Sequence, residues 1–381
     1  MPFQYGEGRH GFVVAESTYG TQVVPAATDA FRLTSFDITP AYNRVEVPEQ
    51  LGTRSLQETV EGRAACTWRL SVAHRPSGTA GTAPDFGLLL KHALGTEAIV
   101  GATSVTYTPL ADPSGLFLSL YDKLDDVMQG VRGAIVNQVT FNWSGDDFST
   151  IEFSGEAKDF FGAGSNTTSG AGTTSSSVVV TDSEHFLAGG LIDVGGDTNS
   201  GAGHKISSIN YTTHTLTIST TATWTTGEVV KAHTPTPTVA GTALYGTIGS
   251  LSLDAGSTTF SHLNGSISIA TGITLYNRGF GSSSATDVQL SAGRRITGNL
   301  SMVLRDNNYN RIVRGQRKVA EDLKLIIGST AGSIVTITGN EVEIDPTAIG
   351  GGAGLIEMSL PMRFKTATVT GAENEFSLAY T

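Results

Sequence analysis

Alternation of apolar and polar residues constrains the fold of this chain more than any other feature of the sequence. In residues 134–143, Ile135 and Val139 fall on one face of an extended chain, with polar side chains on the other. Residues 150–155 repeat the pattern after a polar turn, and residues 356–364 are apolar at every second position. A period of two places successive side chains on opposite faces of a strand. The sequence therefore predicts a mainly β protein whose sheets bury one face.

Helix and linker signals are few. Residues 84–95 begin with Pro and Asp and stop at Gly, and residues 307–318 form a second short candidate helix. Residues 162–177 are almost all Gly, Ser, Thr, Ala and Asn, which predicts a flexible linker. Residues 234–238, Thr-Pro-Thr-Pro-Thr, predict a second, stiffer linker. Short strand patterns lie between the two and predict a small inserted β module at residues 172–236.

The segments on either side of this module follow the same order of patterns. In each, a polar stretch containing Arg precedes an alternating strand, around Trp68 in one and from Ile296 in the other. A helix follows, and a pair of alternating strands closes the segment. Residue identity between the segments is low, so this is a repeat of pattern. We therefore expect a first domain at residues 1–165 and a second at residues 240–381, each a β-sandwich or barrel with one flanking helix.

Composition excludes several classes of protein. Of the 381 residues 39% are hydrophobic, which is enough for a folded core, although only 15% are charged and Gly supplies 46. No apolar run approaches the ~18 residues of a membrane helix, and the first residues lack the core of a signal peptide, so we expect no membrane segment. The net charge of −11 argues against tight binding to a polyanion. The single cysteine, Cys66, excludes an intrachain disulfide framework and has apolar neighbours typical of a buried thiol.

Catalytic and metal-binding motifs are missing. The sequence has no GxSxG elbow, HExxH pair or P-loop, and its eight histidines have no ligand-like spacing. The Asp pairs at residues 125–126 and 146–147 fall where turns are expected. The basic run at residues 311–318 has one aromatic nearby, Tyr309, and favours a solvated helix face or a protein–protein salt-bridge strip over a DNA contact. We therefore expect no enzyme activity, no cofactor and no metal site.

Several motifs in the order found here resemble those of one family. Residues 14–21, Val-Ala-Glu-Ser-Thr-Tyr-Gly-Thr, resemble the start of the tail tube (major tail) proteins of phages with long, non-contractile tails. The strand pair at residues 135–141 and 151–155 is similar to a strand pair of that family. Residues 298–302 before a helix, and the final strand from residue 354, look like a second tube domain. The inserted module is similar to the small β domains that many such proteins carry on the outer surface.

The resemblance implies a structural virion protein that polymerises as stacked rings around a channel for DNA. Six tube domains normally make a ring, so a chain with two would form a trimeric, pseudo-hexameric ring. The channel should repel DNA, and the polar faces of the closing strands would then line it: Gln138, Thr140, Asn142, Glu152, Ser154, Glu156, Glu341, Glu343, Glu357 and Ser359. Arg363 and Lys365 suit such a lining only if they pair with neighbouring carboxylates. The contacts between rings or subunits would use the charged loop and basic residues Glu46, Glu49, Arg54, Glu58, Arg63, Arg294, Arg295, Arg311 and Arg314.

The same resemblance implies partners and a place. The chain would assemble with itself in the bacterial cytoplasm, around a tape-measure protein and between tail-terminator and tail-tip proteins, and would end in the virion. DNA would pass through without specific binding. Two alternatives stay open: another phage virion structural protein, and a carbohydrate-binding or adhesin-type β protein with a sugar platform. The platform would use Trp143, Tyr211, Trp224 and Tyr245.

Overall fold

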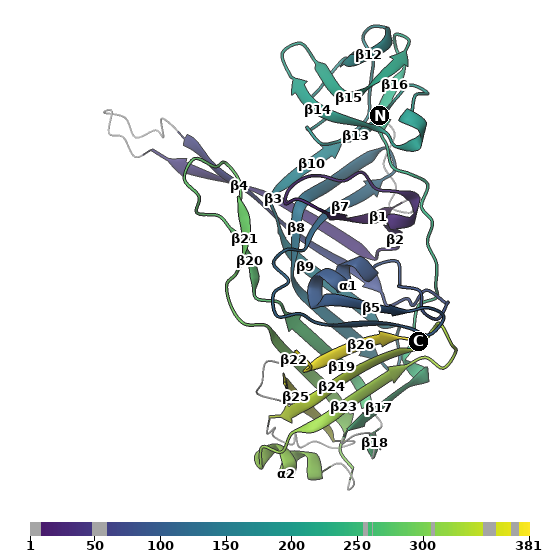
Figure 1. Cartoon of the computed structure of the whole chain (residues 1–381), viewed down its shortest axis with the longest axis vertical. Coiled ribbons are helices and arrows are strands. Elements are labelled where there is room, and N and C mark those ends of the chain that lie inside the picture. Colours follow the sequence, from purple (N-terminus) through teal and green to yellow (C-terminus); the bar gives the residue numbers. More distant parts are fainter. Residues whose placement is uncertain are drawn as a thin grey trace.

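The computed structural model describes residues 9–47, 59–253, 258–260, 262–305, 309–345, 356–366 and 373–381. The protein is mainly β, with 56% of residues in strands, a large antiparallel sheet and a smaller, curled six-strand sheet. The large sheet forms an elongated body, and the small sheet caps one end of it (Figure 1). The predicted mainly β fold is confirmed.

The first unit of the body consists of ten strands and one helix. These are β1 His10–Glu16, β2 Ala30–Phe31, β3 Ser35–Glu46, β4 Thr59–Ala73, α1 Gly87–Leu94, β5 Gly95–Val100, β6 Ser104–Pro109, β7 Phe117–Leu124, β8 Val127–Ser144, β9 Thr150–Ala157 and β10 Asp159–Ala163. Its ladders are β2–β1–β7–β8–β10 and β3–β4–β9–β8, all antiparallel. The long strand β8 belongs to both ladders and bends between them.

The second unit repeats this plan. Its elements are β17 Gly249–Leu253, β18 Thr258–Phe260, β19 His262–Ala270, β22 Arg295–Val303, α2 Asn310–Gln316, β23 Glu321–Ile327, β24 Val335–Ile344, β25 Glu357–Lys365 and β26 Phe376–Tyr380. Its ladders, β18–β17–β23–β24–β26 and β19–β22–β25–β24, match those of the first unit strand for strand. The two units therefore share one strand-pairing scheme although their sequence identity is low.

The two units join edge to edge. Strand β19 pairs with β8 in an unbroken run of seven residue pairs, from Asn264↔Ser144 to Ala270↔Gln138. This ladder merges the two four-strand sheets into one sheet with the order β3–β4–β9–β8–β19–β22–β25–β24. Within the described residues, β3 pairs with β4 alone and is an open edge. Pro40 lies in β3, as expected of a strand at the edge of a sheet.

One face of this sheet covers a core that both units share. A single hydrophobic cluster contains Leu70 and Phe153 of the first unit and Leu300 and Leu360 of the second, all fully buried. Cys66 belongs to it, and burial raises the pKa of its thiol to about 12, which confirms the expected buried thiol. Because the core is continuous, we expect the two units to be stable only together.

A buried histidine lies where the units meet in this core. His74 Nε2 is 2.9 Å from the hydroxyl of Tyr380, and its ring contacts Phe86, Phe141 and Tyr380. Full burial lowers the pKa of His74 to about 3, because protonation would place a charge in an apolar site. His92 of α1 is also buried, and desolvation lowers its pKa to about 4.

These two histidines should make the protein sensitive to acid. Their pKa values in the folded state lie below the ordinary value of 6.5, so the unfolded chain takes up protons first as the pH falls. Their stabilising contribution is complete above about pH 6.5 and is lost on acidification, by about 2 kcal/mol per histidine at pH 5. Denaturant titrations at pH 6.5, 5.8 and 5.0 measure this loss. His74→Phe should flatten the dependence, and an unchanged slope would contradict the assignment.

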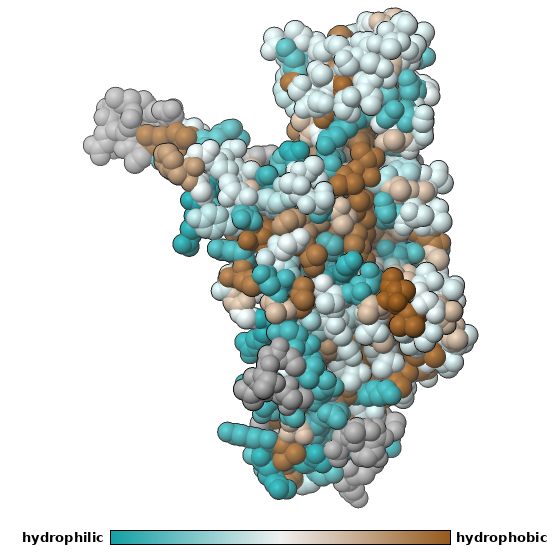
Figure 2. Space-filling model, viewed as in Figure 1, coloured by the Kyte–Doolittle hydropathy of each residue, from teal (hydrophilic) through white to brown (hydrophobic). Residues whose placement is uncertain are grey.

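The insert forms the six-strand sheet in the order β11–β16–β13–β14–β15–β12. Its strands are β11 Asn166–Thr167, β12 Gly172–Val179, β13 Leu191–Val194, β14 His204–Asn210, β15 Thr215–Trp224 and β16 Val229–Ala232. Its surface is mostly of intermediate hydropathy, as its Ser, Thr and Gly content dictates (Figure 2). The predicted flexible linker at residues 162–177 is wrong, because this segment forms the end of β10, β11 and most of β12. Thr fits a pleated strand well, and pairing with β15 and β16 outweighs the flexibility of the glycines.

The insert packs firmly on the first unit. A second hydrophobic cluster combines Phe12, Tyr121 and Phe161 of the first unit with Leu191 and Trp224 of the insert. The chain then returns to the second unit along the first unit (Figure 1). On this path, which includes the predicted stiff linker, the backbone N–H of residue 238 donates to Ala27, that of residue 240 to Asp85 and that of residue 244 to His74.

Candidate functional site: the polar face of the eight-strand sheet

The face opposite the shared core carries polar residues across all eight strands. The ladders align one row of residues from edge to edge, in the order Ser35, Ser71, Glu152, Thr140, Ser268, Thr297, Arg363 and Glu343. Alternation makes this inevitable, because each member of the row neighbours a core residue in its own strand. The row crosses the joint between the units at Thr140 and Ser268 without interruption.

The ten residues predicted to line a channel all lie on this face. They are Gln138, Thr140 and Asn142 of β8, Glu152, Ser154 and Glu156 of β9, Glu341 and Glu343 of β24, and Glu357 and Ser359 of β25. Hydrogen bonds link the strands across it. Ser268 Oγ accepts from Gln138 Nε2 at 2.7 Å and from Thr140 Oγ1 at 3.1 Å, and Ser359 Oγ donates to Asn299 at 2.6 Å. The first two of these bonds span the joint between the two units.

Basic residues on this face are held by carboxylates. Lys365 Nζ lies 2.5 Å from Glu343, and an Arg363 guanidinium nitrogen lies 2.9 Å from Asp345. Arg69 of β4 pairs with Glu152 at 2.5 Å. The condition set for Arg363 and Lys365 in a channel lining is therefore met.

The polar face has a net negative charge. Its acidic residues are Asp37, Glu152, Glu156, Glu341, Glu343, Asp345 and Glu357, and its basic residues are Arg69, Arg295, Arg363 and Lys365. Four positive and seven negative charges give −3 per chain. A polyanion near this surface would therefore meet hydroxyls, amides and excess carboxylates.

One bulge changes the face on which a predicted core residue lies. Between Val136 and Gln138 the pairing of β8 with β9 shifts register, so that Val136 joins the main core together with Val139. Ile135 then lies on the polar face, opposite Glu156. The expectation that Ile135 shares a face with Val139 is wrong for this reason: a bulge adds one residue and inverts the alternation.

Ile135 anchors a hairpin of the second unit against the first. After β19 the chain forms β20 Ile273–Tyr276 and β21 Asp287–Leu290, and Ile273 and Leu275 pack on Ile135. The backbone N–H of Leu275 donates to Glu156 Oε2 at 3.0 Å, and Asn137 Nδ2 donates to the carbonyl of Ile273 at 3.1 Å. The sequence did not predict this contact of the β20–β21 hairpin with Ile135, because alternation says nothing about which distant hairpin covers a strand.

The hairpin β3–β4 extends beyond the sheet as a projecting arm (Figure 1). Glu46 is exposed there, while Arg63 donates to the carbonyl of Gly279, which fixes the arm to the loop after β20. Val45 and Val60 pair across the arm and are half-exposed, and apolar atoms are visible beside its tip (Figure 2). The predicted contact residues Glu49, Arg54 and Glu58 lie outside the described residues.

The other predicted contact residues differ in their surroundings. Arg294 bonds Glu373, Glu375 and the carbonyl of Leu110 within its own chain, at a groove of about 760 Å³. Arg295 is exposed at the start of β22.

Arg311 of α2 is 2% exposed and pairs with Glu321, which Arg314 also contacts at 2.7 Å. A buried guanidinium has no surface to offer a second molecule. We therefore leave Arg311 out of the proposed contacts.

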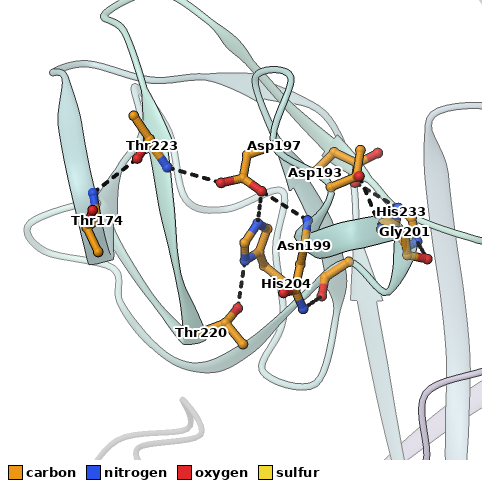
Figure 3. A network of polar contacts seen from close by, with 11 residues as sticks. Thr174, Asp193, Asp197, Asn199, Gly201, His204, Thr220, Thr223 and His233 are labelled. Carbon is orange, nitrogen blue, oxygen red and sulfur yellow. Dashed lines mark hydrogen bonds and ion pairs between the residues drawn. The ribbon is translucent and has the colours of Figure 1, made fainter.

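Two of the histidine–aspartate pairs in the insert, those of His233 and His204, lie at the turn that follows β13 (Figure 3). His233 Nδ1 lies 2.7 Å from Asp193, and its Nε2 lies 3.1 Å from the carbonyl of Gly201. His204 lies between Asp197 at 3.2 Å and Thr220 at 2.7 Å. Each histidine therefore ties a strand to the turn at residues 195–203. Among the residues that the structure describes, no group of three or more His, Cys, Asp or Glu side chains could hold a metal ion.

Comparison with known proteins gives no assignment. No protein-family model matches the chain, and no curated protein matches it. None of the helices in the described ranges is long and apolar enough to cross a membrane.

Proposed function

We propose that this protein is the tail tube subunit of a phage with a long, non-contractile tail. Three copies would form a ring, and stacked rings would form a tube through which DNA leaves the virion. In this proposal each of the two units is a tube domain, and the insert decorates the outer surface. The tape-measure, tail-terminator and tail-tip proteins would be its partners.

The observation that carries the proposal is the joint between the two units. Two units with the same pairing scheme already meet by an edge-to-edge ladder, β8–β19, and form one continuous sheet. The first strand of that sheet, β3, corresponds to β19 and, as far as the described residues show, keeps an open edge. Repeating the same joint between copies would cover the edge of β3 and close a ring. Six units, two from each of three copies, agree with the ring that the resemblance implies.

The polar face suits the inside of such a tube. Each Lys or Arg contact to a phosphate adds affinity that would retain DNA. Here the four basic residues are outnumbered, and three of them pair with carboxylates of their own chain. Hydroxyl and amide side chains fill much of the remaining face. A ring with this face inward would present a hydrated, negative wall to DNA.

The adhesin alternative finds less support. Of the four aromatics suggested for a sugar platform, Trp143 and Trp224 are each 5% exposed and offer no flat surface to a sugar ring, whereas Tyr211 and Tyr245 are exposed. Trp224 also donates its indole N–H to the carbonyl of Gly170 within the insert. No second function is proposed.

Electron microscopy of the purified protein tests the proposal. At rising protein concentration we expect hollow rings or stacked tubes whose end-on averages have threefold symmetry, with one protrusion per chain from the insert. The same experiment is repeated with the tail-tip complex added as an initiator, in case the protein alone assembles slowly. Compact monomers in both conditions would overturn the proposal.

A further inference from the structure

The ladders place the residues of the two units in one-to-one correspondence. Leu70 pairs with Phe153 in the first unit, and Leu300 pairs with Leu360 in the second. Both leucines lie three residues before the end of their strand, β4 or β22. Both partners lie three residues after the start of theirs, β9 or β25. The correspondence therefore follows from pairing and from strand ends together.

This correspondence matches a residue pair of β8 and β9, close to the joint between the units, with a residue pair of β24 and β25 at the other end of the eight-strand sheet. Two residues further along β9, Gly155 pairs with Val136, and two further along β25, Met362 pairs with Ile344. The next pairs are Ile135↔Glu156 in the first unit and Glu343↔Arg363 in the second. Glu343 thus corresponds to Ile135, and Arg363 to Glu156.

The outer part of the β3–β4 hairpin and the hairpin β20–β21 after β19 correspond in the same way. Regular pairing ends near Tyr42↔Ala64 in one and at Ala270↔Arg295 in the other, and in both hairpins it resumes after an irregularity. Beyond it, Arg44 pairs with Glu61, and Ile273 pairs with Leu290. Two residues further along are Glu46 and Leu275. Arg44 therefore corresponds to Ile273, and Glu46 to Leu275.

We propose that Arg44 and Glu46 of one copy contact Glu343 and Arg363 of the next copy in the ring. The inference rests on the proposed function and names the contact that selects the joint between copies. Inside the chain, Ile273 and Leu275 cluster with Ile135, and the backbone N–H of Leu275 donates to Glu156 Oε2. Transferred to the joint between copies, the same placement brings Arg44 to Glu343 and Glu46 to Arg363. There they would join the ion pairs that Glu343 makes with Lys365 and Arg363 makes with Asp345 in their own chain. Both pairs are of opposite charge.

The residues are apolar at the joint inside the chain and charged at the proposed joint between copies, and this difference agrees with how each joint forms. The joint inside the chain forms once, during folding, so apolar residues can stay buried there. The joint between copies is open in the free protein, where Arg44 and Glu46 are exposed and the Arg363 side chain is 56% exposed. Charged residues keep an open sheet edge soluble until the right partner arrives. They also distinguish the joint between copies from the joint inside the chain.

Charge reversal with compensation tests the contact. Glu46→Arg would face Arg363, and Arg363→Glu would face Glu46, so each single variant should raise the protein concentration needed for assembly about tenfold. The double variant E46R/R363E restores opposite charges and should assemble within about threefold of the unaltered protein. Glu184→Arg, an exposed site in the insert, is the control for the change in net charge. Sedimentation and electron microscopy measure assembly, and circular dichroism checks the fold of every variant.

The outcomes separate the two proposals. Weakened single variants with rescue in the double variant would support the contact. Single variants that form rings as readily as the unaltered protein would overturn the contact and leave the ring in place. Weakening without rescue would also overturn it, because each residue would then act independently. An unaltered protein that stays monomeric with and without the initiator would overturn the ring and the contact together.

Discussion

Replacing Gly155 by Ala should destabilise the protein by about 3 kcal/mol. A Cβ at this position would lie 1.8 Å from the backbone oxygen of Ile135 and 2.8 Å from the ring of Trp68. The oxygen belongs to β8 where Ile135 pairs with Glu156 of β9, beside the bulge at Val136 and three residues before the ladder with β19 begins, so it cannot withdraw without disturbing the β8–β9 pairing. The indole of Trp68 is 2% exposed and has no room to move in a close-packed core.

The second unit shows why the glycine is needed. At the corresponding pair the sizes are reversed: Gly298 of β22 pairs with Met362 of β25, whereas Trp68 of β4 pairs with Gly155 of β9. Each pair thus combines one large side chain with a glycine. Gly155 also lies beside the bulge that turns Ile135 toward the β20 hairpin. Its replacement should therefore weaken the joint between the units as well as the core.

Guanidinium chloride titrations measure the loss, and Gly115→Ala is the matched control. A Cβ at Gly115 would meet nothing within 4 Å, so that variant should stay within about 0.5 kcal/mol of the unaltered protein. If both alanine variants unfold at the same denaturant concentration, the close approach of β8 and β9 at this point is wrong.

Alternation in the sequence was sufficient to locate many of the strands. The pattern at residues 356–364 lies in β25, that at residues 134–143 lies in β8, and both short helices occur close to their expected ranges. These features depend on neighbouring residues, which periodicity reports directly. The ten polar residues assigned to one face follow from the same alternation.

Long-range pairing lay beyond such patterns. Nothing local in β8 or β19 specifies that they pair with each other, and the bulge at Val136 leaves no mark on the hydrophobic pattern. The Ser- and Thr-rich strand β12 looks like a linker in isolation, since its order comes from its pairing with β15. Arg311 misleads for a related reason. A basic side chain on a helix normally faces water, and only the buried carboxylate of Glu321, ten residues away, allows it to enter the core.

Loss of the Glu321 carboxylate is the second change from which we expect a large loss of stability. Replacing Glu321 by Met should destabilise the protein by about 3–5 kcal/mol, because it takes the buried carboxylate away from the 2%-exposed guanidinium of Arg311. Arg311→Met should cost a similar amount by leaving the carboxylate behind, whereas Arg314 can offset only part of that charge from a side chain that is 28% exposed.

The double variant R311M/E321M distinguishes a coupled pair from two independent residues. Removing both charges removes both desolvation penalties, so its loss should be well below the sum of the single losses and also below either single loss. Asp322→Met, at the exposed neighbouring position on β23, serves as the control and should change the stability by less than about 0.5 kcal/mol. Additive losses in the double variant would show that Arg311 and Glu321 stabilise the second unit separately. In the coupled case the pair holds α2 against β23 as one unit. A basic residue that the sequence suggested for contacts between molecules then acts inside one chain, and the proposed joint between copies would use Arg44 and Glu46 of β3 with Glu343 of β24 and Arg363 of β25.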